Sequence, residues 1–224
     1  MFTIPGARRV ADKWSKTNAL LSDGRVTKYI PETKKYNKSC LQEMLTKYRR
    51  VVLKPSIGTG GNGLIQVLRD GKQFRYFYQQ KIINFSKFNS LILEIDKVRK
   101  GRIYIVQRGI ELATIYGRPI DYRVKIQKPE QAWIITGMVG RLAPKGSFVT
   151  NLCRGGDQLT LRDGILRSFT KVDFKKKRLE LRKITKLCTT ILEKKYPGVR
   201  QLGFDFGIDK SKDIWIFEVN TKPH

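Results

Sequence analysis

The sequence predicts an α+β fold, because strand-like hairpins and helical repeats of apolar residues alternate along its 224 residues. Residues 51–67 form an apolar run, a glycine-dense turn and a second apolar run, which is the pattern of two strands joined by a loop. Residues 175–196 repeat apolar side chains every three or four positions, which predicts a long helix. A chain of this length is expected to bury a substantial core, as one domain or as two closely joined lobes.

Two short helices are expected before the first strand. Residues 11–21 combine apolar and polar side chains and are followed by a stop signal at Gly24. Ser39 and Gln42 have the spacing of a capping box for a helix that runs to about Tyr48. The elements expected next are strands Val51–Pro55, 64–69 and 72–80, with a tight turn at Asp70-Gly71, and a helix over Asn84–Lys100.

The C-terminal half is predicted to contain two hairpins. The first joins Ile120–Gln127 to Ala132–Leu142, and the second joins Gly203–Asp209 to Asp213–Asn220. A strand over Arg102–Gln107 precedes them, residues 145–158 read as a loop, and the helix over 175–196 lies between the two hairpins.

The glycine-dense turn is the most informative local feature. Gly58, Gly60 and Gly63 fit a pattern shared by dinucleotide-binding folds and kinase phosphate loops. A strand follows these glycines instead of a helix, Lys54 precedes them, and His224 is the single histidine, so the dinucleotide and kinase readings both fail. No Lys-Ser or Lys-Thr follows, so a Walker loop is also excluded. What remains is a flap whose backbone N–H groups approach phosphate oxygens, or a glycine-rich hairpin without a ligand.

Composition sets wider limits on function. The 46 Lys and Arg residues exceed the 19 Asp and Glu residues, and the formal net charge of +27 favours nucleotide, nucleic acid, acidic polymer or acidic protein partners without choosing among them. No recognisable nucleic-acid module is present, although residues 75–78 alternate basic and aromatic side chains. The basic face of the helix over 175–196 is either simply solvated or a docking surface.

The apolar segments and the cysteines indicate where the protein is located and whether it binds zinc. No apolar run reaches the length of a membrane span, and Met1–Val10 lacks the apolar core of a signal peptide, so a soluble intracellular protein is expected. Cys40, Cys153 and Cys188 are far apart and have no histidine partners, which indicates buried or incidental thiols and excludes a zinc site.

Isolated oxygen ligands interrupt the apolar strands of the last hairpin. Glu218 and Asn220 are two residues apart, so their side chains leave the same face of a strand, and the hairpin is able to set Asp205 beside them. Two carboxylates and an amide oxygen suit Mg²⁺ that keeps other positions for water and phosphate. The alternative is that all three are ordinary polar residues of a hairpin.

Further polar residues supply cations and flexible connections. Asp121 and Arg123 share a face of their strand, and Arg123 suits a phosphate or the charge that develops on an acyl-phosphate. Asn151, ahead of Gly155-Gly156, offers an amide beside a flexible turn, and a plain surface loop explains this segment nearly as well.

The order of these motifs resembles the ATP-grasp superfamily over essentially the whole chain. Four segments carry a closer resemblance: Asp12-Lys13-Trp14, Tyr29-Ile30-Pro31-Glu32-Thr33, Leu53-Lys54-Pro55 and Glu218-Val219-Asn220-Thr221-Lys222-Pro223. Through them the sequence is similar to the YheC/YheD-type, endospore coat-associated ATP-grasp proteins of spore-forming bacteria.

The resemblance implies a single ATP-grasp domain over 1–224 whose two α+β lobes clasp the nucleotide, without a separate N-terminal pre-ATP-grasp domain. The smaller glycine-flap lobe would span roughly 24–106 and the C-terminal lobe roughly 107–224. The implied nucleotide-binding residues are Lys13 and Lys54 on the phosphates, Gly58, Gly60, Gly61 and Gly63 in the flap, and Gln107, Arg108, Gly109 and Ile110 at the adenine. The implied metal ligands are Asp205, Glu218 and Asn220, and the implied catalytic residues are Arg123 and Asn151.

The resemblance also implies an activity. Members usually activate a carboxylate as an acyl-phosphate, which an amine or another nucleophile such as a thiol then attacks, with release of ADP and phosphate. Expected cofactors are ATP and Mg²⁺, with Mn²⁺ as a substitute, and the carboxylate and amine substrates are unknown. Phosphoryl transfer depends on positioning and charge neutralisation, so a site without histidine is chemically adequate.

A second hypothesis belongs to another class of function. In it, the chain is a non-catalytic, spore-associated structural protein that keeps the nucleotide pocket, while its basic surface docks an acidic polymer, nucleic acid or acidic spore-coat protein. The expected location is the cytoplasm or the spore. The charge of +27, which ATP does not explain, and the expected lack of a separate acceptor domain favour this hypothesis, whereas the full set of lysines, flap and metal ligands favours the ligase.

Overall fold

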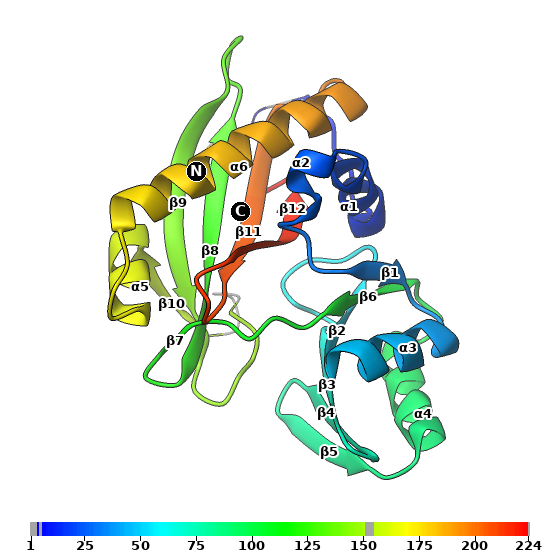
Figure 1. Cartoon of the computed structure of the whole chain (residues 1–224). Coiled ribbons are helices and arrows are strands. Elements are labelled where there is room, and N and C mark those ends of the chain that lie inside the picture. The colour runs from blue at the N-terminus through cyan, green and yellow to red at the C-terminus, as the bar shows by residue number, and fades with distance from the viewer. Residues whose placement is uncertain (1–3, 5, 151–154, 224) are drawn as a thin grey trace. The chain divides into compact units, whose positions relative to one another are not determined.

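The computed structural model describes residues 4, 6–150 and 155–223, and it divides into two compact units. One unit is continuous, Pro31–Ile110, and is called the flap unit here because it carries the glycine-dense turn. The other combines Met1–Ile30 with Glu111–His224 and is called the hairpin unit. Figure 1 shows both units as sheets with helices packed on them. No helix in the described part of the chain is long and apolar enough to cross a membrane.

The flap unit is one six-stranded antiparallel sheet covered on one face by two helices. The strands follow the order β1-β6-β2-β3-β4-β5. Alternate residues such as Val51, Leu53 and Tyr76 point into its core, where they are fully buried. The elements are β1 (Thr33–Lys35), α3 (Lys38–Tyr48), β2 (Arg50–Pro55), β3 (Ile65–Asp70), β4 (Gln73–Tyr78), β5 (Lys81–Phe85), α4 (Phe88–Arg99) and β6 (Tyr104–Arg108).

The predicted hairpin of the flap unit is confirmed, since β3 and β4 pair around the Asp70-Gly71 turn. Two predictions for this unit are wrong. The helix expected from Asn84 begins at Phe88, because residues 81–85 pair with β4 as a further strand. The capping box at Ser39 is replaced by Asn37, whose side chain accepts from the Cys40 N–H at 2.7 Å. Asparagine caps a helix as well as serine does, and its use moves the start of the helix to Lys38.

The hairpin unit is built on a second antiparallel sheet, in the order β10-β9-β8-β11-β12, with β7 paired to β8. Both predicted hairpins are present in it, β8 with β9 and β11 with β12. Its elements are α1 (Lys13–Leu21), α2 (Gly24–Thr27), β7 (Thr114–Ile115), β8 (Arg118–Gln127), β9 (Ile134–Leu142), β10 (Asp157–Thr160), α5 (Leu161–Ser168), α6 (Phe174–Lys195), β11 (Gln201–Ile208) and β12 (Ile214–Asn220).

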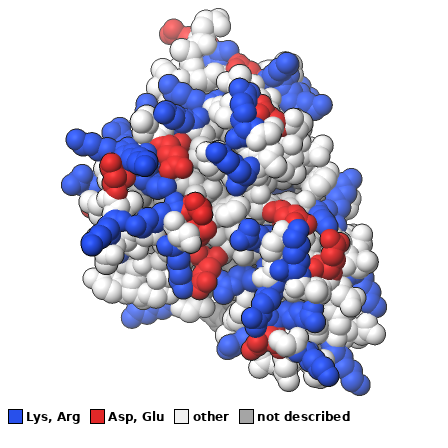
Figure 2. All heavy atoms as spheres, in the orientation of Figure 1, with Lys and Arg blue, Asp and Glu red and all other residues white. Residues whose placement is uncertain are grey.

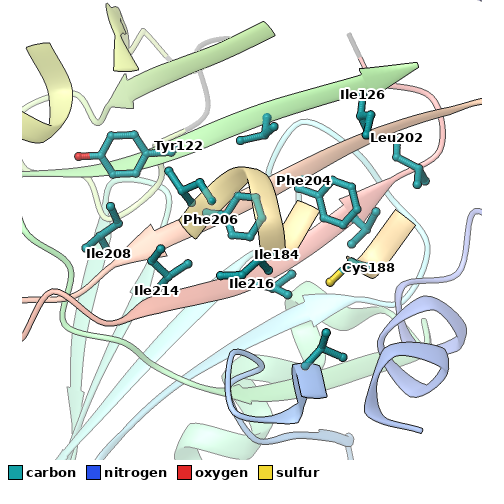
Figure 3. Close-up of a cluster of buried hydrophobic side chains, with 14 of the residues drawn as sticks. Tyr122, Ile126, Ile184, Cys188, Leu202, Phe204, Phe206, Ile208, Ile214 and Ile216 are labelled. Carbon is teal, nitrogen blue, oxygen red and sulfur yellow. The ribbon is translucent and has the colours of Figure 1, made fainter. Parts of the chain in front are cut away.

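The core of the hairpin unit lies between this sheet and α6. Every residue of β11 is buried, and Phe204 and Phe206 stack with ring centroids 5.8 Å apart. Figure 3 shows these rings between β8, β12 and the α6 side chains Ile184 and Cys188. Phe204 and Phe206, the residues directly before and after Asp205, are thus packed in the core, and this packing holds the strand rigidly.

The N-terminal segment belongs to this same core. Leu20 of α1 and Val26 of α2 are buried in the cluster that α6 and β11 form. The backbone N–H of Ile216 on β12 donates to the Tyr29 carbonyl at 2.7 Å. Residues far apart in the sequence, the start of α1 and the end of β12, are thereby placed side by side within one unit.

One stretch of the hairpin unit is more ordered than its sequence predicts. The expected loop over 145–158 ends in β10, which pairs with β9, and α5 follows directly. The Thr160 side chain caps α5 by accepting from the Asp163 N–H at 3.0 Å, so a polar segment starts a helix that apolar periodicity alone does not reveal.

Candidate nucleotide and metal site

The three predicted metal ligands lie together on the β11–β12 hairpin. Asp205 and Glu218 are cross-strand partners, and the register shifts directly after this pair, as in a β-bulge. The Asn220 amide nitrogen lies 3.4 Å from the Asp205 carboxylate. The hairpin thus gathers two carboxylates and one amide at one point of the sheet.

Two arginines hold the Asp205 carboxylate. Arg123 faces Asp205 across the β8–β11 pair and contacts both of its oxygens, with Nη2 to Oδ2 at 3.0 Å. Arg141 of β9 reaches the same carboxylate, with Nη2 to Oδ1 at 2.9 Å. Bidentate pairing of this kind fixes the direction of the guanidinium as well as its charge.

Asp121 completes a buried chain of charges across three strands. It lies opposite Arg141 in the β8–β9 register and accepts from Arg141 Nε at 2.7 Å and Nη2 at 2.5 Å. Burial raises the pKa of the Asp121 carboxyl, and the Arg141 guanidinium acts in the opposite direction. Burial lowers the pKa of Arg141, yet Asp205 and Asp121 outweigh it, so the net shift of the Arg141 pKa is upward. We call the set Asp121, Arg141, Asp205 and Arg123 the charge chain.

A lysine at the start of α1 approaches Glu218 on β12, the strand next to β11. The Lys13 ammonium is 3.5 Å from a Glu218 carboxylate oxygen, and the Lys13 side chain is almost fully buried. Lys13 is the first residue of α1 because Asp12 caps that helix, accepting from the Ser15 N–H at 2.9 Å. The helix start therefore delivers a lysine to the β12 carboxylate.

Lys16, one turn further along α1, is a buried cation that the sequence does not single out. Its ammonium donates to the Val10 carbonyl at 2.6 Å and to the Ala11 carbonyl at 3.3 Å. The Thr221 hydroxyl, just after β12, accepts from the Val10 N–H at 2.9 Å. Burial lowers the pKa of Lys16 to about 8, with Glu218 opposing this shift. These contacts tie the segment before Lys13 to the end of β12.

In the flap unit, Lys54 is the second-to-last residue of β2, just before the glycine-dense loop. Its ammonium donates to the Gln107 side-chain carbonyl at 2.6 Å, and the Gln107 amide donates to the Thr33 hydroxyl at 2.9 Å. All three side chains are buried. The flap unit thus holds Lys54 in place through the Gln107 side chain.

The glycine-dense loop connects β2 to β3, as expected of a flap between strands. Gly58, Gly60, Gly61 and Gly63 all have positive φ angles, which only glycine adopts readily. Gly63 is also tightly packed, because a Cβ there would lie 2.5 Å from the Tyr104 hydroxyl. The loop backbone can therefore follow a path close to a bound anion that other residues would not permit.

The segment expected to hold adenine, residues 107–110, begins at the end of β6 and continues past it. The Arg108 N–H donates to the Glu32 carbonyl at 2.8 Å and the Gly109 N–H donates to the Arg50 carbonyl at 2.9 Å. Gly109 is needed where it lies, since a Cβ would come within 2.3 Å of the Arg50 side chain. These two amides serve the flap unit itself, so recognition of a base by residues 107–110 would rely on their other backbone groups.

Asn151, the second predicted catalytic residue, and Cys153 lie outside the described residues. Arg141 and Lys16 are the functional candidates that the sequence motifs missed. A signal for Arg141 was available, because a lone arginine interrupts the end of the apolar strand 134–142 and the hairpin register sets it opposite Asp121. Lys16 has no comparable signal, since its role depends on contacts with Val10 and the end of β12.

The donor set fits Mg²⁺ that arrives with phosphate better than a preformed metal centre. Within the described ranges, no group of three or more His, Cys, Asp and Glu residues could hold a metal ion. Mg²⁺ commonly uses one or two protein carboxylates and takes its remaining ligands from phosphates and water. Glu218 and Asp205 with the Asn220 amide satisfy that requirement, although Asp205 shares its oxygens with two arginines.

Two solved structures share the fold of this chain. D-cycloserine synthetase DcsG superposes with a TM-score of 0.61 at 10% identity, over 95% of this chain and 63% of that chain. N5-carboxyaminoimidazole synthase from Aspergillus clavatus, in complex with ADP and 5-aminoimidazole ribonucleotide, superposes with a TM-score of 0.58 at 8% identity, over 98% of this chain and 46% of that chain. The chain therefore has the fold of these two enzymes, which is the ATP-grasp fold.

The family assignment follows from the sequence comparison. Residues 6–224 match the family described as YheC/D like ATP-grasp, and the chain belongs to that family, as its motifs predict. Endospore coat-associated protein YheD of Bacillus subtilis (strain 168) is 28% identical over 220 residues, which are 95% of this chain and 48% of YheD. The chain spans about half the length of this curated relative.

Proposed function

We propose that this chain is an ATP- and Mg²⁺-dependent ligase that activates a carboxylate and joins it to an amine, or to a thiol, with release of ADP. The observation that supports it best is the meeting of Lys13, Glu218, Asp205 and the two arginines at the end of the β11–β12 hairpin. Carboxylates for a metal and cations for phosphate are thereby offered together, which is the requirement of phosphoryl transfer.

We assign separate roles within each unit. In the hairpin unit, Glu218, Asp205 and Asn220 would hold Mg²⁺, which when bound neutralises phosphate charge. Arg123 and Arg141 would stabilise the charge that develops on the transferred phosphoryl group, because preorganised buried donors cost little reorganisation during reaction. Lys13 would bind phosphate beside Glu218. In the flap unit, Lys54 and the loop 58–63 would bind phosphate through the ammonium and the backbone N–H groups.

The chemistry proceeds in two balanced steps. A substrate carboxylate oxygen attacks the γ-phosphorus of ATP, the bond from that phosphorus to the β,γ-bridging oxygen breaks, and ADP leaves with the electron pair. The amine nitrogen then attacks the acyl carbon, the carbon–oxygen bond to phosphate breaks, and inorganic phosphate leaves while the amine proton passes to water. Neither step requires a histidine, because positioning and charge stabilisation supply most of the rate.

The name of the relative YheD suggests the setting for this activity. We propose that the chain acts in spore formation, in the cytoplasm or at the spore, on an acidic or peptide-like acceptor. The net charge of +27 favours an anionic substrate, since the two arginines of the charge chain are already paired with Asp121 and Asp205.

The test is a substrate screen with the purified chain. ATP and Mg²⁺ are supplied with pooled amino acids, acidic peptides or cell-wall fragments, and ADP and product masses are followed. We expect ADP release with one pool, at least tenfold above the rate without an acceptor, together with a product mass equal to the two substrates minus water.

Matched variants separate the site from the rest of the chain. Glu218→Gln and Asp205→Asn should abolish turnover and weaken Mg²⁺-dependent ATP binding, because a neutral amide cannot supply the anionic ligand. Glu130→Gln, at an exposed position of the same unit, should change neither. ATP binding without ADP release in every pool would contradict the ligase and favour a non-catalytic nucleotide-binding protein.

A further inference from the structure

We propose that the outer face of α6 binds duplex nucleic acid through its phosphate backbone, independently of base sequence. This surface is the lysine face, defined as Lys175, Lys176, Lys183, Lys186 and Lys194. It lies in the hairpin unit, on the side of α6 away from the core that Ile184 and Cys188 enter. The ATP chemistry proposed above makes no use of it.

Four members of the lysine face lie along one side of α6, with Leu179 and Thr190 between them. From Lys176 the exposed positions follow at 179, 183, 186, 190 and 194, each three or four residues after the last, and so they lie on one face. At a rise of about 1.5 Å per residue, the stretch from Lys176 to Lys194 is about 27 Å long. In Figure 2 blue Lys and Arg atoms lie along the path that α6 takes in Figure 1.

The charges of this face lack counter-ions in the described structure. The helix has nine Lys and Arg residues and two glutamates. Glu180 pairs with Lys177 at 2.7 Å, and Glu193 pairs with Lys128 at 2.7 Å and accepts from the Trp133 indole. Both acidic side chains are thus used by groups outside the lysine face. None of the five lysines forms an ion pair within the described ranges, although surface lysines elsewhere do so.

The chemistry of this face selects among polyanions. Leu179 is its single exposed large apolar side chain, with about half of its surface exposed, so the face lacks the apolar stripe by which helices enter membranes. It carries no aromatic side chain, and single-stranded nucleic acids are usually bound by stacking on aromatic residues. Flexible lysine side chains on a rigid helix instead suit a rigid polyanion with outward-facing charges, and duplex nucleic acid carries one charge per about 1.7 Å of its axis.

The test measures binding of a fluorescent 24-base-pair DNA duplex of random sequence to the full chain by anisotropy at several salt concentrations. With about three to five phosphates neutralised, the slope of log K against log salt should lie at about −3 to −5, so affinity should fall steeply between 50 and 200 mM salt. A second duplex of different sequence should bind within about twofold of the first.

A matched pair of triple variants locates the surface. Lys176→Glu, Lys183→Glu and Lys186→Glu together should weaken duplex binding at least a hundredfold and leave ATP affinity within twofold. Lys38→Glu, Lys72→Glu and Lys81→Glu make the same change in net charge at exposed lysines of the flap unit and should weaken it less than tenfold. Circular dichroism verifies that both variants are folded.

Three results would overturn the assignment. Equal losses in the two triple variants would mean that overall charge, and not this face, attracts the duplex. Equal affinity for the single strand, or for polyglutamate at the same concentration of charge, would mean that the face does not prefer a duplex. A salt-independent interaction would exclude phosphate neutralisation altogether.

Discussion

Single cations have different environments in this chain, and those environments predict different behaviour. Lys54 is held by Gln107, a neutral partner, whereas Lys13 faces the Glu218 carboxylate. Lys54 lies at the end of β2, next to the glycine-dense loop, and its ammonium would add a charge-assisted hydrogen bond to a phosphate bound there. A loss of its charge should therefore be felt directly in phosphate binding.

We expect Lys54→Met to weaken ATP binding tenfold or more, because a charge-assisted hydrogen bond is worth about 1.5–3 kcal/mol. Methionine keeps most of the buried side-chain volume, so the flap unit should remain folded. Isothermal titration calorimetry provides the measurement, and Lys72→Met, at an exposed lysine of the same unit, is the control. An unchanged affinity in Lys54→Met would remove this lysine from the site.

Lys16 should titrate well below an ordinary lysine. Burial lowers its pKa to about 8 from 10.5, so between these values the folded chain has lost a proton that the unfolded chain keeps. Folding stability should accordingly rise with pH across this window. The Lys16 Cε resonance, assigned by its loss in Lys16→Met, should show a midpoint near 8. A midpoint near 10.5 would show that water reaches the ammonium.

At the scale of elements, the packed strands of the hairpin unit both carry and position the charged candidate residues. β11 is buried along its whole length, and its register with β8 and β12 brings Arg123 and Glu218 to either side of Asp205. The glycine-dense loop contributes its backbone instead of side chains. Its positive φ angles let the backbone turn, and at Gly63 a side chain would clash. The hairpin unit thus relies on a rigid hairpin, and the flap unit on a glycine loop.

Gly63→Ala should destabilise the flap unit by about 1–3 kcal/mol. The residue has a φ of +77°, and a Cβ there would lie 2.5 Å from the Tyr104 hydroxyl and 2.9 Å from the Pro55 side chain. Urea unfolding followed by circular dichroism measures the effect. Gly137→Ala is the matched control, because the nearest atom to its Cβ would be 4.0 Å away, and it should change stability by less than about 0.5 kcal/mol. Equal effects at both positions would mean that Gly63 is not sterically required.

At the scale of the whole molecule, the two units differ in how the chain builds them. All buried residues of the flap-unit core come from one continuous segment, whereas the core of the hairpin unit needs both ends of the chain. Leu20 and Val26 reach that core from a segment that precedes the flap unit in the sequence. The flap unit is in this sense inserted into the other.

This organisation predicts which fragment folds alone. Residues 31–110 expressed by themselves should unfold cooperatively in urea, with a stability of no more than about 3–5 kcal/mol as expected for so small a core. Residues 111–224 without 1–30 should fail to fold stably, because the apolar surface that α1 and α2 cover would be exposed to water. A cooperative transition in the second fragment would contradict this account of the core.

The sequence by itself determined the α+β class, the two C-terminal hairpins, the glycine loop and the family, since these depend on local periodicity and on short motifs. It also singled out Asp205, Glu218 and Asn220, because polar residues in apolar strands are conspicuous. Three boundaries were not predicted: β5 instead of a helix start, the Asn37 cap, and β10 with α5. Strand pairing decides β5 and β10, whereas local side-chain caps decide where α3 and α5 begin.

The tertiary structure alone decided how the charges are connected. Arg141 joins Asp121 to Asp205 because strands distant in sequence come into register, and Lys16 is buried because the end of β12 meets the segment before α1. Hydrogen bonds and ion pairs between such segments have no periodic signature in the sequence. They form when distant strands pair in the sheet. The sequence therefore indicates Asp205, Glu218 and Asn220 as candidates, and the fold shows which residues contact them.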